Sequence, residues 1–252
     1  MLPPERRLGR ALELIEEHKF FTLHAGRQTG KTTSLMWLQD QLSRTGSWRA
    51  LWVDIETARE QPDPTIAMSV ILENLERAHA HRYPDLDGSA EAARTSSHPQ
   101  TMVLRYLSRL AALDPRPLVV LFDEADGLVG EAMVAFLTQL RQGYIERSRL
   151  AFPASVVLVG QRQVRDYALD LEDRRAASWP GTTSPFNITA EATTLGSFTE
   201  AEVAELYDQH TAATGQRFAA QAVALRKGLS WGEKLFVREV EHAGKHVRIV
   251  GC

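Results

Sequence analysis

Short apolar runs separated by amphipathic stretches constrain the fold of this chain more than any other feature of its sequence. Each run is four to seven residues long and rich in β-branched or aromatic residues, which favours a strand over a buried helical segment. The runs are FFTL at 20–23, RALWVDI at 49–55, LVVLF at 118–122, SVVLV at 155–159 and FNIT at 186–189. Strands that are apolar on both faces are typical of parallel sheets covered by helices on both sides. The sequence therefore predicts an α/β fold.

The segments between these runs carry apolar residues at helical spacing. We expect helices over about 5–18, 32–42, 65–79, 101–113 and 130–147. The stretch 84–100 is polar and has few large apolar residues, so it is expected to be a surface loop. His79 and His81 lack the cysteine or carboxylate partners of a zinc site, and we expect both at the surface.

From Leu195 onward the pattern becomes helical only, which marks a change of domain. Thr199 is a candidate N-cap, because Glu202 follows three residues later. We predict an α/β domain over 1–194 and a short helical region over 195–252. The end of this region departs from a helical pattern, since LFVREV and HVRIV flank an EHAGK turn within 228–252 and predict a hairpin.

Residues 25–33 read AGRQTGKTT and match most of a phosphate-binding loop, in which a glycine and four residues precede Gly-Lys-Ser/Thr. Gly30, Lys31 and Thr32 match this pattern, whereas Ala25 stands where the first glycine is expected and Gly26 follows it. A glycine at 30 allows backbone N–H groups to turn toward a phosphate at the N-terminus of the next helix. Lys31 would then reach the terminal phosphates, and the Thr32 hydroxyl would ligate magnesium.

The loop follows a β-prone run and opens a leucine-rich helix, which favours a nucleotide site over a structural turn with a solvated lysine. We therefore predict that this segment binds a nucleoside triphosphate, ATP with Mg²⁺. The predicted binding residues are Ala25, Gly26, Arg27, Gln28, Thr29, Gly30, Lys31, Thr32 and Thr33. Alanine at 25 is compatible with this prediction unless that residue needs a positive φ. Without ligand, Lys31 is expected to be solvent-exposed.

A pair of carboxylates, Asp123 and Glu124, follows the most apolar run in PLVVLFDEAD at 117–126. Unpaired buried carboxylates are costly, whereas at the carboxyl edge of a parallel sheet they would face a ligand crevice. Asp123 is a candidate magnesium ligand opposite Thr32, binding the ion directly or through a water on it. Glu124 is a candidate catalytic base that deprotonates an attacking water. The competing interpretation is an acidic pair that only complements the next helix.

AGRQTGKTT together with VVLFDEAD resembles the P-loop ATPases of the AAA-like and STAND-like group. From Phe20 to about Gln216 the chain is similar to one prokaryotic AAA-like ATPase-domain family, with SPFNI and LGSFTEAEV in order. The resemblance implies a three-layer parallel sheet ordered 5-1-4-3-2 and a helical lid after it. It also implies a sensor of the terminal phosphate at the end of the strand beside the acidic pair. Gln161 is the candidate there, although the family usually has Asn, Ser or Thr.

Two further sets of polar residues follow strands. Arg162 and Arg165 are candidates to stabilise transition-state charge, in cis or from a neighbouring subunit, against the alternative of solvated arginines. Asp54 and Glu56 end the RALWVDIE run, and we expect a supporting role for them rather than a catalytic one.

Composition limits the choice of partners. The net charge of −3 gives no overall attraction to nucleic acid, although a local basic patch stays open. The N-terminus lacks a signal-peptide pattern, no apolar run approaches the length of a membrane span, and the single cysteine is Cys252, so we expect a cytoplasmic protein. The leading hypothesis is an ATP-binding switch or weak ATPase acting with a protein partner or as a homo-oligomer. A DNA- or RNA-handling ATPase and a nucleotide-binding module without turnover remain alternatives.

Overall fold

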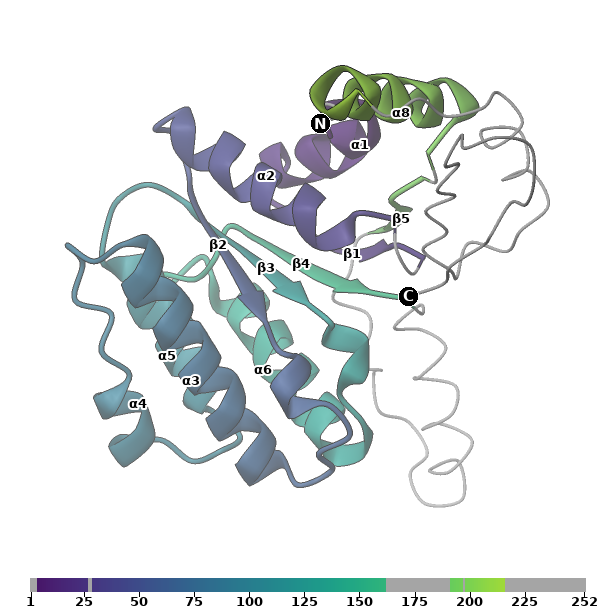
Figure 1. Ribbon diagram of the computed structural model, residues 1–252. Helices are drawn as coiled ribbons and strands as arrows, with labels where there is room; N and C mark the ends of the chain where they lie inside the picture. Colours follow the sequence, from purple (N-terminus) through teal and green to yellow (C-terminus); the bar gives the residue numbers. More distant parts are fainter. Residues whose placement is uncertain (1–3, 27–28, 162–190, 197, 216–252) are drawn as a thin grey trace.

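Parallel strands form a sheet at the centre of the molecule (Figure 1). The computed structural model describes residues 4–26, 29–161, 191–196 and 198–215. The described strands are β1 (Phe20–His24), β2 (Arg49–Asp54), β3 (Leu118–Asp123), β4 (Ser155–Gly160) and β5 (Glu191–Thr194). They lie in the order β2-β3-β4-β1-β5, and every neighbouring pair is parallel. Read from the other edge the order is 5-1-4-3-2, so the predicted α/β fold and strand order are confirmed.

Helices cover both faces of this sheet (Figure 1). One face carries α1 (Glu5–Glu16) and α2 (Lys31–Arg44), and α8 (Glu200–Thr214) lies on the same side of the sheet. The other face carries α3 (Pro64–Arg82), α4 (Glu91–Ser96), α5 (Met102–Ala112) and α6 (Gly130–Glu146). Because successive strand residues point to opposite faces, each central strand contributes to two cores. In β3, Val119 and Leu121 pack with α1 and α2, whereas Val120 and Phe122 pack with α3, α5 and α6.

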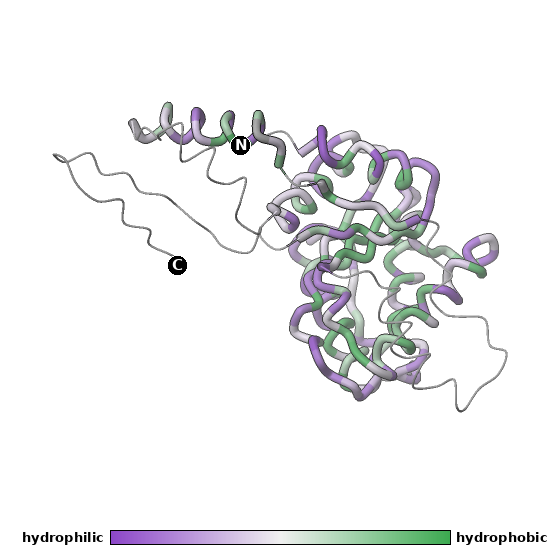
Figure 2. Tube along the Cα trace, turned by 90° about the vertical axis from the view of Figure 1, so that its right-hand side faces the viewer, coloured by the Kyte–Doolittle hydropathy of each residue, from purple (hydrophilic) through white to green (hydrophobic). Residues whose placement is uncertain are grey.

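The distribution of hydrophobic residues follows these layers. Figure 2 shows hydrophobic residues along the central strands and hydrophilic ones on outward-facing helical turns. The five helices expected from apolar spacing are all present, as α1, α2, α3, α5 and α6. Within the described ranges, no helix has the length and apolar character required to cross a membrane.

The outer edge of β2 has two of its backbone groups occupied by side chains. The Trp52 backbone N–H donates to Gln39 Oε1 at 2.7 Å, and the Tyr83 hydroxyl donates to the Ala50 carbonyl oxygen at 2.9 Å. Gln39 comes from α2, and Tyr83 is the residue directly after α3. The helices on both faces therefore contribute to covering this edge.

The polar stretch 84–100, predicted as a surface loop, instead contains α4 and packs on the core. Ala90 and Ala93 are buried, and the Tyr106 hydroxyl donates to the Gly88 carbonyl oxygen at 2.5 Å. Alanine is too small to stand out in an apolar pattern, so the spacing did not predict this packing.

His79, predicted at the surface, is fully buried on α3. It lies on the helix face that also carries Leu72 and Leu75, at helical spacing that its polar neighbours concealed. The Gly88 backbone covers its ring so closely that an added Cβ would lie 2.0 Å from His79 Nδ1. The surface prediction was therefore wrong for His79, whereas His81 is exposed.

β5 was not predicted, because its side chains alternate between partly buried and exposed and form no apolar run. It pairs with β1 at the edge of the sheet opposite β2. The strand predicted at 186–189 and the hairpin predicted within 228–252 lie outside the described residues. The domain boundary near Leu195 stays a prediction.

Candidate functional site

The phosphate-loop segment connects β1 to α2, as its pattern predicts. Gly30 precedes the first residue of α2 with φ of 73°, a left-handed conformation that favours glycine. Ala25 is not among the described residues with positive φ, so an alanine fits there without strain. The Ala25 backbone N–H donates to the Gly160 carbonyl oxygen at 3.1 Å, which ties the loop to the end of β4.

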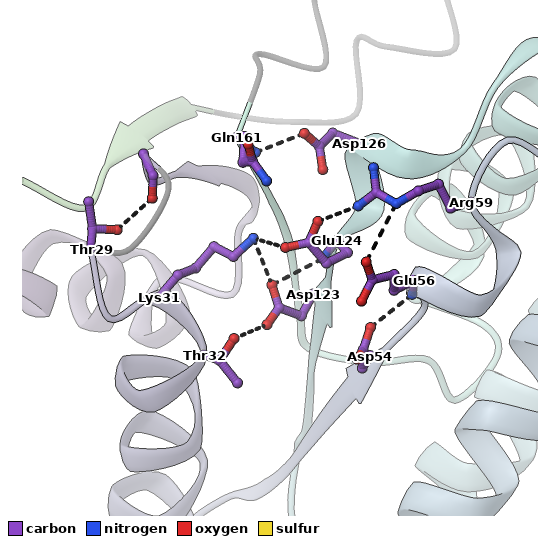
Figure 3. A network of polar contacts seen from close by, with 11 residues as sticks. Thr29, Lys31, Thr32, Asp54, Glu56, Arg59, Asp123, Glu124, Asp126 and Gln161 are labelled. Atoms are coloured by element: carbon purple, nitrogen blue, oxygen red, sulfur yellow. Dashed lines mark hydrogen bonds and ion pairs between the residues drawn. The ribbon is translucent and has the colours of Figure 1, made fainter. Parts of the chain in front are cut away.

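Lys31 lies against the carboxylates at the end of β3 (Figure 3). Its ammonium donates to Glu124 Oε1 and lies 3.3 Å from Asp123 Oδ1. The side chain is only 10% exposed, so the expectation of a solvent-exposed lysine was wrong. The physical reason is that two carboxylates at the end of β3, Asp123 and Glu124, attract the ammonium group. Burial alone would lower the pKa of Lys31, but the bonds and charges of Glu124 and Asp123 outweigh it and raise that pKa.

Thr32 and Asp123 form an oxygen-rich pair beside Lys31. The Thr32 hydroxyl donates to Asp123 Oδ2 at 3.0 Å, and Asp123 Oδ1 accepts the Glu124 backbone N–H at 3.0 Å. Mg²⁺ prefers oxygen ligands and is usually held by one or two carboxylates together with phosphate and water. A hydroxyl and a carboxylate that already meet fit such an ion. The described residues contain no larger group of carboxylate, histidine or cysteine side chains that could enclose a metal.

Glu124 has an unusual backbone and two cationic partners. Its φ of 58° and ψ of 29° lie in the left-handed region, a conformation that costs a non-glycine residue on the order of 1–3 kcal/mol and occurs often at functional sites. Besides Lys31, its carboxylate accepts a hydrogen bond from Arg59 Nη2 at 2.6 Å. Burial alone would raise the pKa of Glu124, but Lys31 and Arg59 together lower it.

Arg59 was not anticipated from the sequence. It follows the short helix η1 (Glu56–Ala58), directly after β2, and its Nε lies 3.7 Å from Glu56 Oε1. The signal that could have revealed it is its position after the strand next to β3, since the carboxyl ends of parallel strands meet at one edge. Asp54 also lies there, where its Oδ1 accepts the Glu56 backbone N–H at 2.8 Å.

Gln161 is exposed at the end of β4, beside the acidic turn η2 (Ala125–Gly127). Its backbone N–H donates to Asp126 Oδ2 at 2.8 Å (Figure 3). Gly160 passes so close that an added Cβ would lie 2.6 Å from the Asp126 carboxyl carbon. Asp126, the last residue of DEAD, therefore holds the end of the strand that carries the predicted sensor.

The structure brings together most of the predicted site residues. Thr29 is buried and its hydroxyl donates to the Gly26 carbonyl oxygen at 2.9 Å, whereas Thr33 is exposed in the first turn of α2. Arg27, Gln28, Arg162 and Arg165 lie outside the described residues.

A parallel sheet ordered in this way, with a phosphate loop after β1 and an acidic pair after β3, is the arrangement of P-loop ATPases. The family of AAA domains matches residues 15–168, more than half of the chain. The chain belongs to the AAA domain family, an ATP-binding family of P-loop ATPases. A search of curated proteins found no match.

Solved structures share the fold at low sequence identity. A Walker-type ATPase of Pyrococcus abyssi aligns with a TM-score of 0.61 and 15% identity over 92% of this chain and 64% of its own. Cdc6p of Pyrobaculum aerophilum aligns with a TM-score of 0.51 and 15% identity over 83% of this chain and 47% of its own. A DNA replication initiation factor aligns with a TM-score of 0.50 and 11% identity over 89% of this chain and 56% of its own. The chain thus spans less than two thirds of the length of each.

Proposed function

We propose that this chain hydrolyses ATP with magnesium and that the nucleotide acts as a switch. The observation that supports the proposal is the meeting of Lys31, Thr32, Asp123 and Glu124 at one edge of the sheet (Figure 3). These four side chains supply a cation for phosphate, two oxygen ligands and a base. AAA-domain membership agrees with this chemistry.

Each group has a separate task in the proposed reaction. The backbone around Gly30, at the start of α2, presents N–H groups to the phosphates. Lys31 neutralises the terminal phosphates. Thr32 and Asp123 would hold Mg²⁺, which supplies charge neutralisation to the phosphate oxygens when bound. Glu124 accepts the proton of the attacking water, and Gln161 is the proposed sensor of the terminal phosphate.

The ion pairs of Lys31 support the switch. Lys31 pairs with Glu124 and Asp123, and a triphosphate would compete with them for the same ammonium. Nucleotide binding would therefore leave Glu124 with Arg59 as its described cationic partner. Nucleotide binding at the loop would thus change which cations pair with Glu124, the proposed base.

The first experiment measures ATP binding by calorimetric titration and phosphate release by the parent protein. Lys31→Ala is expected to abolish measurable ATP binding because the phosphates lose their cation. Lys19→Ala is the matched control, since Lys19 precedes β1 at the opposite end of the strand. Because the substitution also removes a partner of Glu124, the melting temperature of each variant must be recorded.

Unchanged ATP affinity in Lys31→Ala would contradict the assignment of residues 25–33 as the nucleotide site. If the parent binds ATP but does not release phosphate, the proposed hydrolysis is wrong and the chain is a nucleotide-binding module. We propose that the nucleotide state is recognised by a protein partner or by a second copy of this chain. Light scattering of the purified chain with and without ATP separates the two, because only the second case changes its mass.

A further inference from the structure

Arg7, on α1, contacts two segments that are far from it in sequence. Its Nη1 donates to the Thr29 carbonyl oxygen in the phosphate loop at 3.0 Å. Its Nε donates to the Gly196 carbonyl oxygen at 2.9 Å, and its Nη2 contacts the same oxygen. Its guanidinium carbon also lies 4.1 Å from the centre of the Phe198 ring. A single side chain thus joins α1 and the phosphate loop to the segment before α8, of which it contacts Gly196 and Phe198.

The Phe198 ring also faces the loop directly. A Cβ added to Gly30 would lie 3.7 Å from Phe198 Cζ, which is van der Waals contact. Leu195, directly after β5, anchors the start of this segment. It is buried, and its backbone N–H donates to the His24 carbonyl oxygen at 2.7 Å. The Phe198 ring therefore contacts Arg7 and lies close to Gly30, the glycine that precedes α2.

α8 begins immediately after Phe198, so this contact reaches the helix without an intervening linker. Thr199 caps the helix in a reciprocal arrangement with Glu202. Arg6, the neighbour of Arg7, forms an ion pair with Glu205 of α8 at 3.5 Å, so α1 also contacts α8 through a second side chain. A displacement of the segment at Phe198 would thus move the first turn of α8.

The bond to Thr29 also fixes the direction of the next amide. In a planar trans peptide the carbonyl and the following N–H point in opposite directions. By accepting from Arg7, the Thr29 carbonyl turns the Gly30 N–H away from Arg7. Gly30 is the residue whose left-handed backbone opens the loop at the N-terminus of α2.

We infer that Arg7 is a positioning residue that holds the Thr29–Gly30 end of the phosphate loop and couples it to α8. The inference rests on the proposed nucleotide site and adds the route by which occupancy reaches the helical segment. The planar fork of arginine suits the task because it donates to two carbonyl groups and stacks on a ring at the same time. Lysine carries the same charge as a single point and cannot reproduce this geometry.

The test compares Arg7→Ala and Arg7→Lys with Arg6→Ala as the matched control. Arg6 lies on the same helix and contacts α8 through Glu205. We expect Arg7→Ala to weaken Mg-ATP binding about tenfold or more, as a charge-assisted bond at the loop is lost. Arg7→Lys should restore part of this affinity, and Arg6→Ala should bind like the parent. Calorimetric titration measures the affinities.

The change in hydrogen exchange of α8 on addition of Mg-ATP separates coupling from a loss of stability, because a loss of stability alters exchange with and without ATP. In the parent and in Arg6→Ala, Mg-ATP should slow exchange in both the loop and α8. In Arg7→Ala at saturating Mg-ATP, the loop should respond and α8 should not. If Arg7→Ala does not fold, Arg7→Lys decides, with weaker binding at an unchanged melting temperature as the expected result.

Parental ATP affinity together with a parental α8 response in a folded Arg7 variant overturns the inference. That result leaves hydrolysis by the parent intact, so the proposed function survives it. A parent that binds ATP without turnover contradicts the proposed hydrolysis alone, since the effect of Arg7 on binding can still be measured. A parent that binds no ATP overturns both.

Discussion

Glu124 accepts hydrogen bonds from two cations, Lys31 and Arg59, while it stands in a left-handed conformation. Replacing it by glutamine keeps the shape of the side chain and removes the charge that takes a proton from water. General-base catalysis typically contributes about 10²–10⁴-fold in rate, so Glu124→Gln should release phosphate more slowly by about that factor while still binding ATP. Single-turnover phosphate release and calorimetric titration measure the two quantities.

Asp123→Asn is the matched comparison, because Asp123 is the neighbouring carboxylate and contacts Thr32. This variant should lose magnesium-dependent ATP affinity itself. Hydrolysis at the parental rate by Glu124→Gln would remove Glu124 as the base.

Arg59 donates to the second carboxylate oxygen of Glu124 at 2.6 Å, and in the proposed function it is the described cation that stays with Glu124 once nucleotide engages Lys31. We expect Arg59→Ala to lower kcat by roughly tenfold or more, the scale of one charge-assisted hydrogen bond, with a much smaller change in ATP affinity. Arg59→Lys should recover part of the rate. Steady-state kinetics over a range of ATP concentrations separates kcat from KM.

Glu56→Gln controls for the surroundings of Arg59, because Glu56 lies 3.7 Å from Arg59 Nε. It should retain most of the parental kcat. Equal losses of kcat and affinity in Arg59→Ala would point to phosphate binding by Arg59 instead of positioning of Glu124.

At the scale of elements, η2 joins the ends of β3 and β4 through Asp126. Gly160→Ala would place a methyl group 2.6 Å from the Asp126 carboxyl carbon, within the distance that requires the neighbour to move. Overpacking of this kind typically costs about 1–3 kcal/mol, so we expect a lower free energy of unfolding and a lower kcat. Denaturant unfolding and phosphate release give both values.

Gly9→Ala is the matched glycine, since an added Cβ on α1 meets nothing within 4 Å. It should stabilise the protein by about 0.5–1 kcal/mol, the usual difference between the two residues within a helix. In the double variant with Asp126→Gly, which removes both the Cγ at 2.6 Å and the Cβ at 2.7 Å from the added methyl group, the cost of Gly160→Ala should become smaller. Additive costs of the two substitutions would contradict a direct clash.

The elements that the sequence predicted are those with a local signal. β3 and β4 consist of consecutive large apolar residues, and Gly30-Lys31-Thr32 is a contiguous motif, so both could be found without knowing the fold. β5 and α4 have weak local signals, because their packing depends on small or partly exposed residues. Arg7 and Arg59 depend on contacts over 22 and 65 positions in sequence, which no local pattern reports. The chemical roles of the site residues remain predictions.

For the whole molecule, His79 links stability to pH. Burial, followed by the nearby charge of Arg49, lowers the pKa of His79, and Asp87 opposes this shift. The unfolded chain, with a pKa of about 6.5 for histidine, therefore binds a proton more readily than the folded one. Protonation therefore favours the unfolded chain. The contribution of His79 to the free energy of unfolding is full above about pH 6.5 and declines as the pH falls below it.

His79→Leu should accordingly lose less stability than the parent between pH 7.5 and about pH 5.5. Melting temperatures over this range, taken for the parent and the variant, isolate the contribution of His79 from that of other titrating groups. His81→Gln, at an exposed position of the same helix, should follow the parent. Parallel pH profiles for the parent and His79→Leu would show that burial of this ring does not govern acid sensitivity.

The covered edge of β2 has a consequence for crowded solutions. Exposed sheet edges are templates on which strands of other molecules can anneal, and fibrils grow by that route. Here the Trp52 N–H and the Ala50 carbonyl are already occupied by Gln39 and Tyr83. An incoming strand would have to displace both side chains before it could form the same bonds. We therefore expect this edge of the sheet to disfavour strand addition and aggregation.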